Sequence, residues 1–468
     1  MNLNLIIRYV LPVAVGALIW ASPIPDGVSI DAWHILAMMT ATIVGIVSMP
    51  LNIGCVAFIG LTATMLTGTL SPSVALDGFS RPLLWLIVMA FIFSRAFIKT
   101  GLGNRLSLWV LSRIGDSSLK VAYGLVFSGA ILSAGIPSAT ARSGGVIYPI
   151  LRSICSALGS EPDKNPNKIG RYLTQTYFQS EAFISYLFPT GITCNVLIIE
   201  FAKKIADIDI TWVSWTLGAS ALVLVSGILV PYVMYLIIPP DMKKSPEAKS
   251  AAKRLLGELG PMGRSEKSLA AIFAITIALF VASDYIGISA TLVALLAVSA
   301  MLLAGVITWD DVLSEKSSWN TLIWMGTLIC MASALADKGF MTWVGSAVGS
   351  HIAGMNWILV TFLVCLFFNY SQYAFASLTA RTVAFYGVCL TALLSVGCPA
   401  VVAILALAHL GNTSACLTQY TSGFAPVFYG AGYFTAKEWW KIGFAVSWLH
   451  FAIVMILGPI WWKVIGFW

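Results

Sequence analysis

Two short stretches of the chain carry a serine, a threonine and an arginine at the same spacing. Residues 137–145 read Pro-Ser-Ala-Thr-Ala-Arg-Ser-Gly-Gly, and residues 376–382 read Ala-Ser-Leu-Thr-Ala-Arg-Thr. Hydroxyl groups beside unpaired N–H groups at a helix start attract a carboxylate, because the helix dipole is positive there. Two such places suit a ligand with two carboxylates. We therefore predict six substrate-binding residues, namely Ser138, Ala139, Thr140, Ser377, Leu378 and Thr379.

The alternative interpretation of these hydroxyl groups is local. Serine and threonine in a turn often cap the backbone and touch no ligand. The duplication favours a binding site, because a site shared between two repeats takes matching residues from each of them.

A second pair of motifs follows the first, and each has two threonines three residues apart inside an apolar run. Glycine and proline in such a run free backbone carbonyls, which coordinate a cation or accept from a substrate. Thr193 and Thr421 are further substrate candidates. The alternative is a kink relieved by threonine hydroxyls. The candidates for a cation or backbone site are Gly191, Asn195, Thr418, Ser422 and Gly423.

Three charged residues lie near these motifs. Arg142 and Arg381 are candidates for neutralising a bound anion. Alternatively, each arginine caps its own hairpin or extends to the membrane interface. For Glu181, a buried neutral acid is the preferred interpretation and proton coupling is the alternative.

Membrane helices must position these residues. Of the 468 residues, 59% are hydrophobic and 10% are charged, whereas a soluble domain has about 25% charged residues. The mean hydropathy is +0.88, and the apolar runs are continuous, which excludes a β-barrel. We predict an all-α polytopic membrane protein with about 11 transmembrane helices. The short apolar pieces around Ser138 and Ser377 predict two re-entrant hairpins, near residues 121–150 and 358–394.

Several functions are excluded by what the chain lacks. The four histidines are scattered and no carboxylate pair lies near them, so we expect no enzyme, no metal site and no cofactor. A channel would need a charged ring or a filter motif. The net charge of +7 comes from basic residues in short loops, which indicates orientation in a membrane and no nucleic-acid binding. Of the function classes considered, a secondary transporter is the one that these observations leave.

The chain repeats itself at an offset of 239 residues, at which Trp85 matches Trp324 and the two tip stretches match each other. Residues 95–120 carry five basic residues and residues 332–355 carry one. By the positive-inside rule the first copy faces the cytoplasm and the second faces outward, so the repeats are inverted. The predicted organisation is an N-terminal transmembrane helix (1–29), a first inverted repeat (30–238), a cytoplasmic basic loop (239–268) and a second inverted repeat (269–468).

These motifs resemble the divalent anion/sodium symporter (DASS) family over essentially the whole chain, with its bacterial and plastid dicarboxylate exchangers as the most similar branch. The resemblance is carried by several segments in the same order, among them Gly78-Phe79-Ser80, Phe97-Ile-Lys99-Thr100-Gly101, Ile136-Pro137-Ser138 and Gly423-Phe-Ala425-Pro426. It implies a homodimer in the lipid bilayer, in which a scaffold holds a mobile transport part. Transport in the family is elevator-like.

The resemblance also implies a function, the exchange of small dicarboxylates of the 2-oxoglutarate/malate type across the inner membrane. The family's hairpin tips carry Ser-Asn-Thr or a relative, which binds substrate carboxylates and, in some members, helps to form sodium sites. Ala139 and Leu378 stand at the asparagine positions here, and the lost amides weigh against sodium coupling. Sodium-coupled dicarboxylate symport remains the alternative, and a receptor or inactive homologue is a third.

Overall fold

The structure is a computed structural model that describes residues 3–48, 51–352 and 354–468. Within these ranges the chain is helical and has no β-strand. The helices of the first half are α1 (Leu3–Ala21), α2 (Ile30–Ser48), α3 (Ile53–Leu66), α4 (Pro72–Asp77), η1 (Gly78–Ser80), α5 (Pro82–Thr100), α6 (Leu102–Ile114), α7 (Ser118–Ser133), η2 (Thr140–Ile147), α8 (Tyr148–Ala157), α9 (Gly170–Ile184), η3 (Pro189–Gly191), α10 (Thr193–Ala206) and α11 (Trp212–Ile237).

Helix α12 (Pro246–Glu258) lies in the segment that connects the halves. The helices after it are α13 (Arg264–Ile286), α14 (Ala290–Leu303), α15 (Trp309–Ser314), α16 (Lys316–Asp337), α17 (Phe340–Ile352), α18 (Trp357–Tyr370), η4 (Ser371–Ala374), α19 (Leu378–Ser395), α20 (Ala400–Thr413), η5 (Ser414–Cys416), α21 (Ala425–Tyr429), α22 (Ala436–Ala452), η6 (Ile453–Leu457) and α23 (Gly458–Val464). The all-helical fold predicted from the sequence is confirmed.

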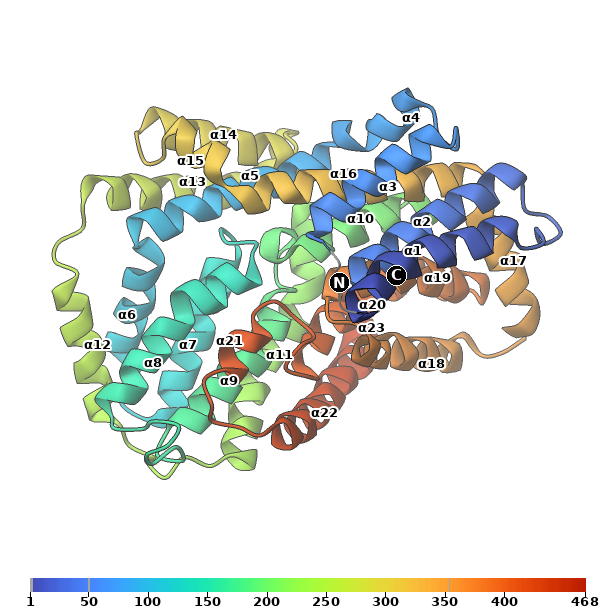
Figure 1. Cartoon of the computed structure of the whole chain (residues 1–468). Helices are drawn as coiled ribbons and strands as arrows, with labels where there is room; N and C mark the ends of the chain where they lie inside the picture. The colour runs from blue at the N-terminus through green and yellow to red at the C-terminus, as the bar shows by residue number, and fades with distance from the viewer. Residues whose placement is uncertain (1–2, 49–50, 353) are drawn as a thin grey trace.

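The helices of the two halves follow one another in the same order. The long helices α5 and α16 lie side by side across the top of the molecule in Figure 1, and each is followed by a shorter helix, α6 or α17. Gly101 and Gly339 make these two turns with φ of 75° at both positions, a conformation that favours glycine because it has no Cβ. A helical hairpin follows in each half. This order agrees with the repeat in the sequence, and the inverted relation of the halves stays a prediction.

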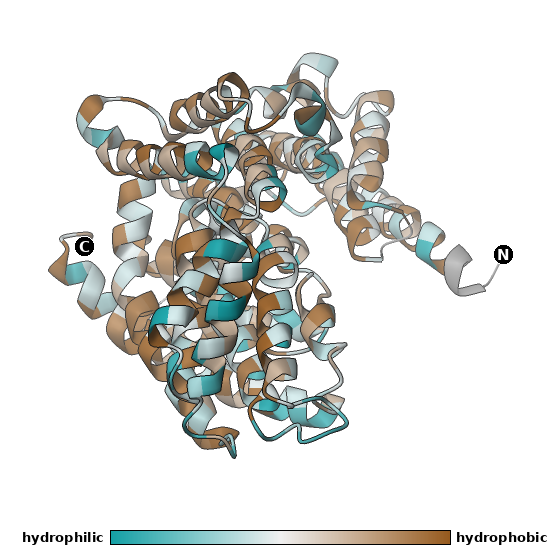
Figure 2. Cartoon of the chain, turned by 90° about the vertical axis from the view of Figure 1, so that its left-hand side faces the viewer, coloured by the Kyte–Doolittle hydropathy of each residue, from teal (hydrophilic) through white to brown (hydrophobic). Residues whose placement is uncertain are grey.

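Eight of the described helices are long and apolar enough to cross a membrane, and five shorter helices are also apolar. Figure 2 shows hydrophobic residues along most of the helices. Large apolar side chains face outward, with Leu303 91% exposed and Leu66 82% exposed. Exposed apolar surface on this scale suits contact with lipid.

In each half, two helical arms are joined by a short non-helical tip where a hairpin is predicted, and the re-entrant path of these hairpins stays a prediction. In the first, α7 ends at Ser133 and the chain returns through η2 and α8, so this arm extends to Ala157, beyond the predicted end at residue 150. Pro149 lies where the π-helix η2 passes into α8, at a change in the hydrogen-bond ladder of one continuous helical stretch. In the second, α18 and η4 lead to the tip, and α19 returns from Leu378.

The connecting segment 239–268 is polar, as predicted, yet it contains α12 and the first turn of α13. Helix α12 packs against α6, and its buried face consists of Ala248, Ala251 and Ala252. Arg105 of α6 donates to Glu266 at 2.8 Å and to the carbonyl of Gly260 at 2.9 Å. The connection is therefore fixed to the first half. Its low hydropathy conceals a helix that buries three alanines and half-buries Leu255 and Leu256.

Two apolar cores support the hairpins. The smaller core is built from α2, α3, α5, α16 and α17, and the larger core gathers around α7, α9, α11 and α20. Helix α5 contributes to both cores. So do α10 and α19, since Leu197 and Val383 belong to the smaller core while Ile198 and Tyr386 belong to the larger. The helices that begin at the candidate site thus lie where the two cores meet.

Candidate functional site

The two hairpin tips meet at one cavity of about 280 Å³. This volume is near the lower end of the range for small-molecule sites, about 300 to 1,000 Å³. Thr193, Ser422 and Gly423 from the second pair of motifs also line the cavity. All six predicted tip residues contribute to its wall, namely Ser138, Ala139, Thr140, Ser377, Leu378 and Thr379.

The serines of the two tips make the same local hydrogen bonds. The hydroxyl of Ser138 accepts from the N–H of Ala141 at 3.2 Å, and that of Ser377 accepts from the N–H of Ala380 at 3.3 Å. Each serine therefore caps a helix, as the local interpretation predicts. A cap uses only an acceptor position of the hydroxyl, so its hydrogen remains available for a ligand. Capping and ligand binding are compatible at both tips.

Three helices start at the cavity. η2, which continues into α8, begins at Thr140, α10 begins at Thr193, and α19 begins at Leu378. Their first N–H groups and their dipoles make the surroundings positive. No charged side chain lines the cavity among the residues that the structure describes. Attraction of an anion to its wall therefore comes from helix starts and hydroxyl groups.

The first tip and the second break touch each other. A Cβ atom on Gly423 would lie 2.6 Å from Oγ1 of Thr140, closer than real Cβ contacts come. The neighbouring Ser422 is buried and, within the described part of the chain, its hydroxyl has no hydrogen-bond partner. An unpaired buried hydroxyl costs about 1 to 3 kcal/mol, so Ser422 is a ready donor to a ligand in the cavity.

Two of the predicted residues of the first break lie behind the cavity. Asn195 donates to the carbonyls of Ser185 and Phe188, both at 2.9 Å, and accepts from Asn412 at 2.8 Å. The carbonyl of Gly191 accepts from Arg142 at 3.0 Å. Asn195 thus fixes the break between η3 and α10, and it joins α10 to α20 of the other half.

Thr418 and Thr421 of the second break are buried and point inward. Oγ1 of Thr421 donates between the carbonyls of Ala415 and Thr418, each at 2.9 Å. Oγ1 of Thr418 accepts from the N–H of Tyr420 at 3.4 Å. The structure does not bring either threonine into the wall of the cavity. Their hydroxyls close the turn that follows α20.

Arg142 braces the first hairpin from inside the protein. Its guanidinium donates to the carbonyls of Ile136 and Gly191 and to the hydroxyl of Ser185, and it forms an ion pair with Glu181. Both charged side chains are fully buried. The hairpin and the break are therefore held together by one arginine, and Glu181 has an ionic partner.

Arg381 occupies the matching place in the second half. It donates to the carbonyl of Phe368 at 2.8 Å and to that of Gly411 at 2.7 Å, and its guanidinium lies 4.1 Å from the centre of the Phe368 ring. Arg381 is also fully buried. Like Arg142, it holds a hairpin to the helix behind it and does not form part of the cavity wall.

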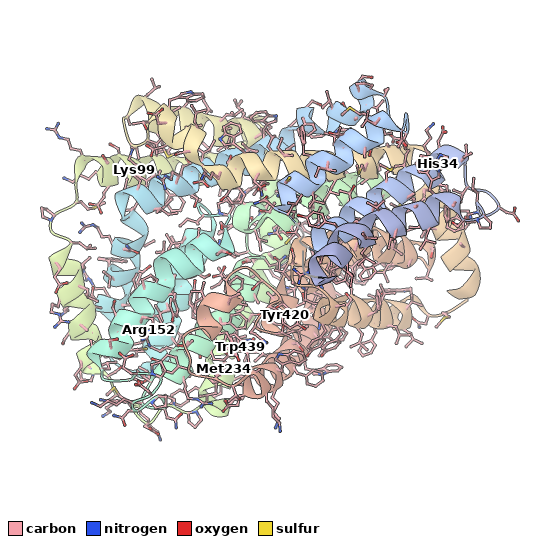
Figure 3. All side chains as sticks on the ribbon, viewed as in Figure 1. His34, Lys99, Arg152, Met234, Tyr420 and Trp439 are labelled. Atoms are coloured by element: carbon pink, nitrogen blue, oxygen red, sulfur yellow. The ribbon has the colours of Figure 1, made fainter. Side chains whose placement is uncertain are left out.

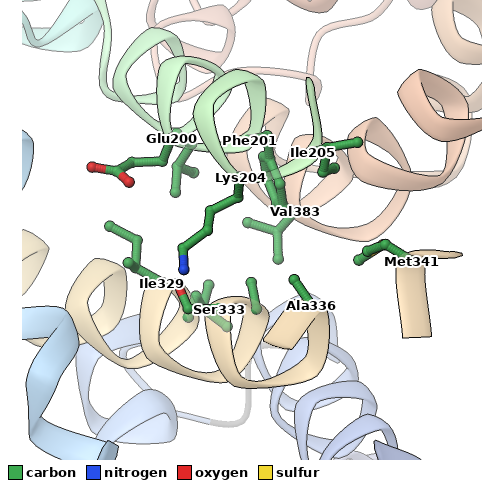
Figure 4. A pocket seen from close by; sticks show the side chains of 12 residues that line it. Glu200, Phe201, Lys204, Ile205, Ile329, Ser333, Ala336, Met341 and Val383 are labelled. Atoms are coloured by element: carbon green, nitrogen blue, oxygen red, sulfur yellow. The ribbon is translucent and has the colours of Figure 1, made fainter. Parts of the chain in front are cut away.

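A separate narrow cavity lies between α10 and α16, as Figure 4 shows. Its lining is apolar apart from Ser333, Glu200 and Lys204, and Lys204 forms an ion pair with Asp337 at 3.4 Å. The hairpin tips do not reach it. We therefore assign the candidate site to the cavity between the tips.

Some residues of the site could not be found from the sequence. Phe91 and Phe424 line the cavity, and Asn412 completes the pair with Asn195. Phe424 is the exception, because it directly follows Gly423 and its place in the cavity wall could have been predicted from that neighbour. Phe91 lies in the middle of α5 and Asn412 near the end of α20, and neither belongs to a duplicated motif.

The family described as "Sodium:sulfate symporter transmembrane region" matches residues 3–468 of this chain. The chain is 41% identical over 464 residues to "Putative malate transporter YflS" of Bacillus subtilis (strain 168), which covers 99% of this chain and 97% of that protein. It is 39% identical over 459 residues to "Dicarboxylate transporter 1, chloroplastic" of Arabidopsis thaliana, which covers 97% of this chain and 82% of that protein.

Among solved structures, the chain resembles the YdaH transporter of Alcanivorax borkumensis with a TM-score of 0.55 and 14% identity, over 99% of this chain and 97% of the other. A likeness at this identity supports the fold alone. The family match spans nearly the whole chain, and the two relatives are similar from end to end. The protein is therefore a multi-pass membrane protein that belongs to the divalent anion/sodium symporter family, as its motifs predict.

Proposed function

We propose that this protein transports small dicarboxylates, exchanging one for another in the manner of a 2-oxoglutarate/malate translocator. The observation that carries the proposal is the meeting of two matching serine-capped tips at one uncharged cavity. Two tips with equal hydrogen-bonding geometry suit the two carboxylates of one substrate. Relatives named as malate and dicarboxylate transporters support the same substrate class.

The surroundings of the arginines favour exchange over sodium coupling. Broken helices in transporters free carbonyl oxygens that coordinate sodium. Here the carbonyl of Gly191 accepts from Arg142, and that of Gly411 accepts from Arg381. The guanidinium groups of Arg142 and Arg381 therefore lie beside the hairpins, where a sodium ion would need the same carbonyl oxygens as ligands. The hydroxyl of Thr421 donates its hydrogen to the carbonyls of Ala415 and Thr418, and its lone pairs stay free.

Sodium-coupled symport is the second candidate, and the family description that names sodium favours it. It would require ligands other than the carbonyl of Gly191, because that oxygen lies against the guanidinium of Arg142. The oxygen ligands that the cavity wall offers are the hydroxyls of Ser138, Thr140, Thr193, Ser377, Thr379 and Ser422.

Membership of the family supports further proposals about the setting. We infer that the protein lies in the inner (plasma) membrane, that it forms a homodimer, and that it is a transporter without catalytic activity. We also infer elevator transport, in which the hairpins move with their cavity past the fixed helices. The position of α10 and α19 at the junction of the two cores supports this division.

Serine-to-alanine variants test the site. Ser138→Ala and Ser377→Ala each remove a hydroxyl from the cavity, so exchange of labelled 2-oxoglutarate for malate in proteoliposomes should fall about tenfold or more. Ser153→Ala is the matched control, since its hydroxyl lies on the exposed side of α8 and donates to Pro149. Normal exchange by both tip variants, at normal abundance in the membrane, would contradict the site.

A further inference from the structure

Helices α6 and α12 form a paired surface of their own, apart from the cavity between the hairpin tips. We propose that this α6–α12 surface, residues 102–114 and 246–262, binds the headgroups of anionic phospholipids in the leaflet where α5 and α13 end. The inference goes beyond the proposed function, because it concerns a different ligand at a different place, and its test does not require transport.

The α6–α12 surface lies across the ends of two membrane spans. Helix α6 begins directly after α5, and α13 begins shortly after α12; both α5 and α13 are long and apolar enough to cross a membrane. Figure 1 shows α6 and α12 beside each other at the left edge, turned across the direction of α5 and α13. A helix that runs across the end of a span lies along the membrane surface. In the predicted orientation this is the cytoplasmic surface.

The two helices are antiparallel and are tied together at both ends. Arg105, in the first turn of α6, donates to the carbonyl of Gly260, just beyond the end of α12, at 2.9 Å. At the other end, the N–H of Ser245 donates to the carbonyl of Asp116 at 2.9 Å. The start of α12 therefore lies beside the end of α6, and their basic residues share one surface.

The connecting segment 239–268, all of which the structure describes, carries positive charge that its own acidic residues do not neutralise. Two of its four acidic residues, Glu258 and Glu266, are in ion pairs with arginines at 3.6 and 2.8 Å. The other two are Asp241 and Glu247. Against them stand six basic residues that form no ion pair within the protein, namely Lys243, Lys244, Lys249, Lys253, Arg264 and Lys267. Basic residues beside a membrane attract anionic lipids.

Exposed apolar side chains accompany these charges. Trp109 of α6 is 49% exposed, and Leu259, directly after α12, is 43% exposed. The guanidinium of Arg113, which is also exposed, lies 5.6 Å from the centre of the Trp109 ring. Tryptophan and arginine are typical of the headgroup layer, where an apolar body and a polar tip are both satisfied. Basic and apolar side chains together fit a lipid headgroup with its acyl chain better than a soluble anion.

The bound lipid would also hold the base of the first hairpin. Ser118 begins α7, and its hydroxyl donates to the carbonyl of Met242. Its N–H donates to the carbonyl of Lys243 at 3.2 Å. The start of the hairpin is therefore bonded directly to the basic segment that leads into α12.

The test labels the surface with lipid. The full chain is reconstituted in phosphatidylcholine vesicles with a trace of photoactivatable phosphatidylglycerol or phosphatidylcholine, and labelled peptides are identified by mass spectrometry. Phosphatidylglycerol should label residues 102–114 and 246–262 about fivefold more than phosphatidylcholine does. The triple variant Arg113→Gln, Lys249→Gln, Lys253→Gln should label nearly equally with both lipids. Equal labelling of the unaltered protein by the two lipids would overturn the proposal.

The matched control is Lys463→Gln. Lys463 lies 5.0 Å from the centre of the Trp468 ring, an exposed pair like Arg113 and Trp109, but it belongs to α23. This variant should keep the full preference of the α6–α12 surface for phosphatidylglycerol.

Two further measurements use the unaltered protein, so they decide the matter even if the triple variant fails to fold. Raising the salt concentration should reduce the preference, because salt screens exposed charges, and a preference that salt leaves unchanged would contradict charge recognition. Soluble glycerol phosphate in excess over the labelled lipid should not displace it. Complete displacement would show a site for free anions and overturn the assignment to lipid. Both readouts stand whether or not the protein exchanges dicarboxylates.

Discussion

Thr140 of the first hairpin and Gly423 of the second break are in such close contact that a Cβ on the glycine would lie 2.6 Å from the threonine Oγ1. The backbone of Gly423 has no positive φ, so this contact alone excludes a side chain there. The wall of the cavity is therefore made jointly by residues 283 positions apart, one from each half.

Gly423→Ala should push Thr140 out of place and abolish most of the exchange, since overpacking costs about 1 to 3 kcal/mol. Adding Thr140→Ala should relieve the clash and restore the melting temperature without restoring full exchange. Gly145→Ala serves as the control, because a Cβ there meets no atom within 4 Å. Equal activity of Gly423→Ala and Gly145→Ala would show that the contact is unimportant.

The hydrogen bond between Asn195 and Asn412 joins the two halves, so we expect substitutions at these two positions to have non-additive effects on stability. Asn412→Asp places a carboxylate oxygen against Oδ1 of Asn195, where an N–H now donates at 2.8 Å. We expect a loss of stability of about 1 to 3 kcal/mol, measured as the melting temperature of the purified protein. A double-mutant cycle with alanine at both positions measures the pair itself, and strictly additive single effects would refute the coupling.

The contact between Lys99, labelled in Figure 3, and Asp311 of α15 predicts a dependence on pH. The hydrogen bond from Lys99, helped by the N–H of Thr308, lowers the pKa of Asp311 from 3.8 to about 2. A lowered pKa stabilises the fold above pH 4, and the gain is lost as the pH falls towards 2. Because the Lys99 side chain is 40% exposed, the pair contributes less than about 1 kcal/mol.

Lys99→Met should accordingly lower the melting temperature slightly at neutral pH, and its difference from the wild type should vanish between about pH 4 and pH 2. Lys99→Arg keeps the charge and should behave like the wild type. A difference that persists unchanged at pH 2 would mean that Lys99 acts through packing.

The tip residues could be predicted from the sequence because the same pattern occurs in both halves. Ser138 and Ser377 stand in matching stretches, and both line the cavity. The partners of Arg142 and Arg381 could not be predicted, since the direction of a long side chain depends on how the hairpin folds. Residues such as Phe91 reach the cavity only through the packing of α5, which leaves no local pattern.

The helix in the connecting segment could not be predicted from the sequence. Helix α12 fully buries only three alanines and half-buries two leucines, so its polar composition predicts a loop. Its packing against α6 supplies the stability that its own hydropathy does not reveal. Whether such a polar segment forms a helix therefore depends on its tertiary contacts.

The central claim is exchange of dicarboxylates at the hairpin tips without sodium. The most direct test is uptake of labelled 2-oxoglutarate into proteoliposomes that are empty or preloaded with malate, each with and without an inward sodium gradient. We predict uptake into preloaded vesicles only, at a rate that sodium does not change. Uptake into empty vesicles driven by the sodium gradient would contradict the account.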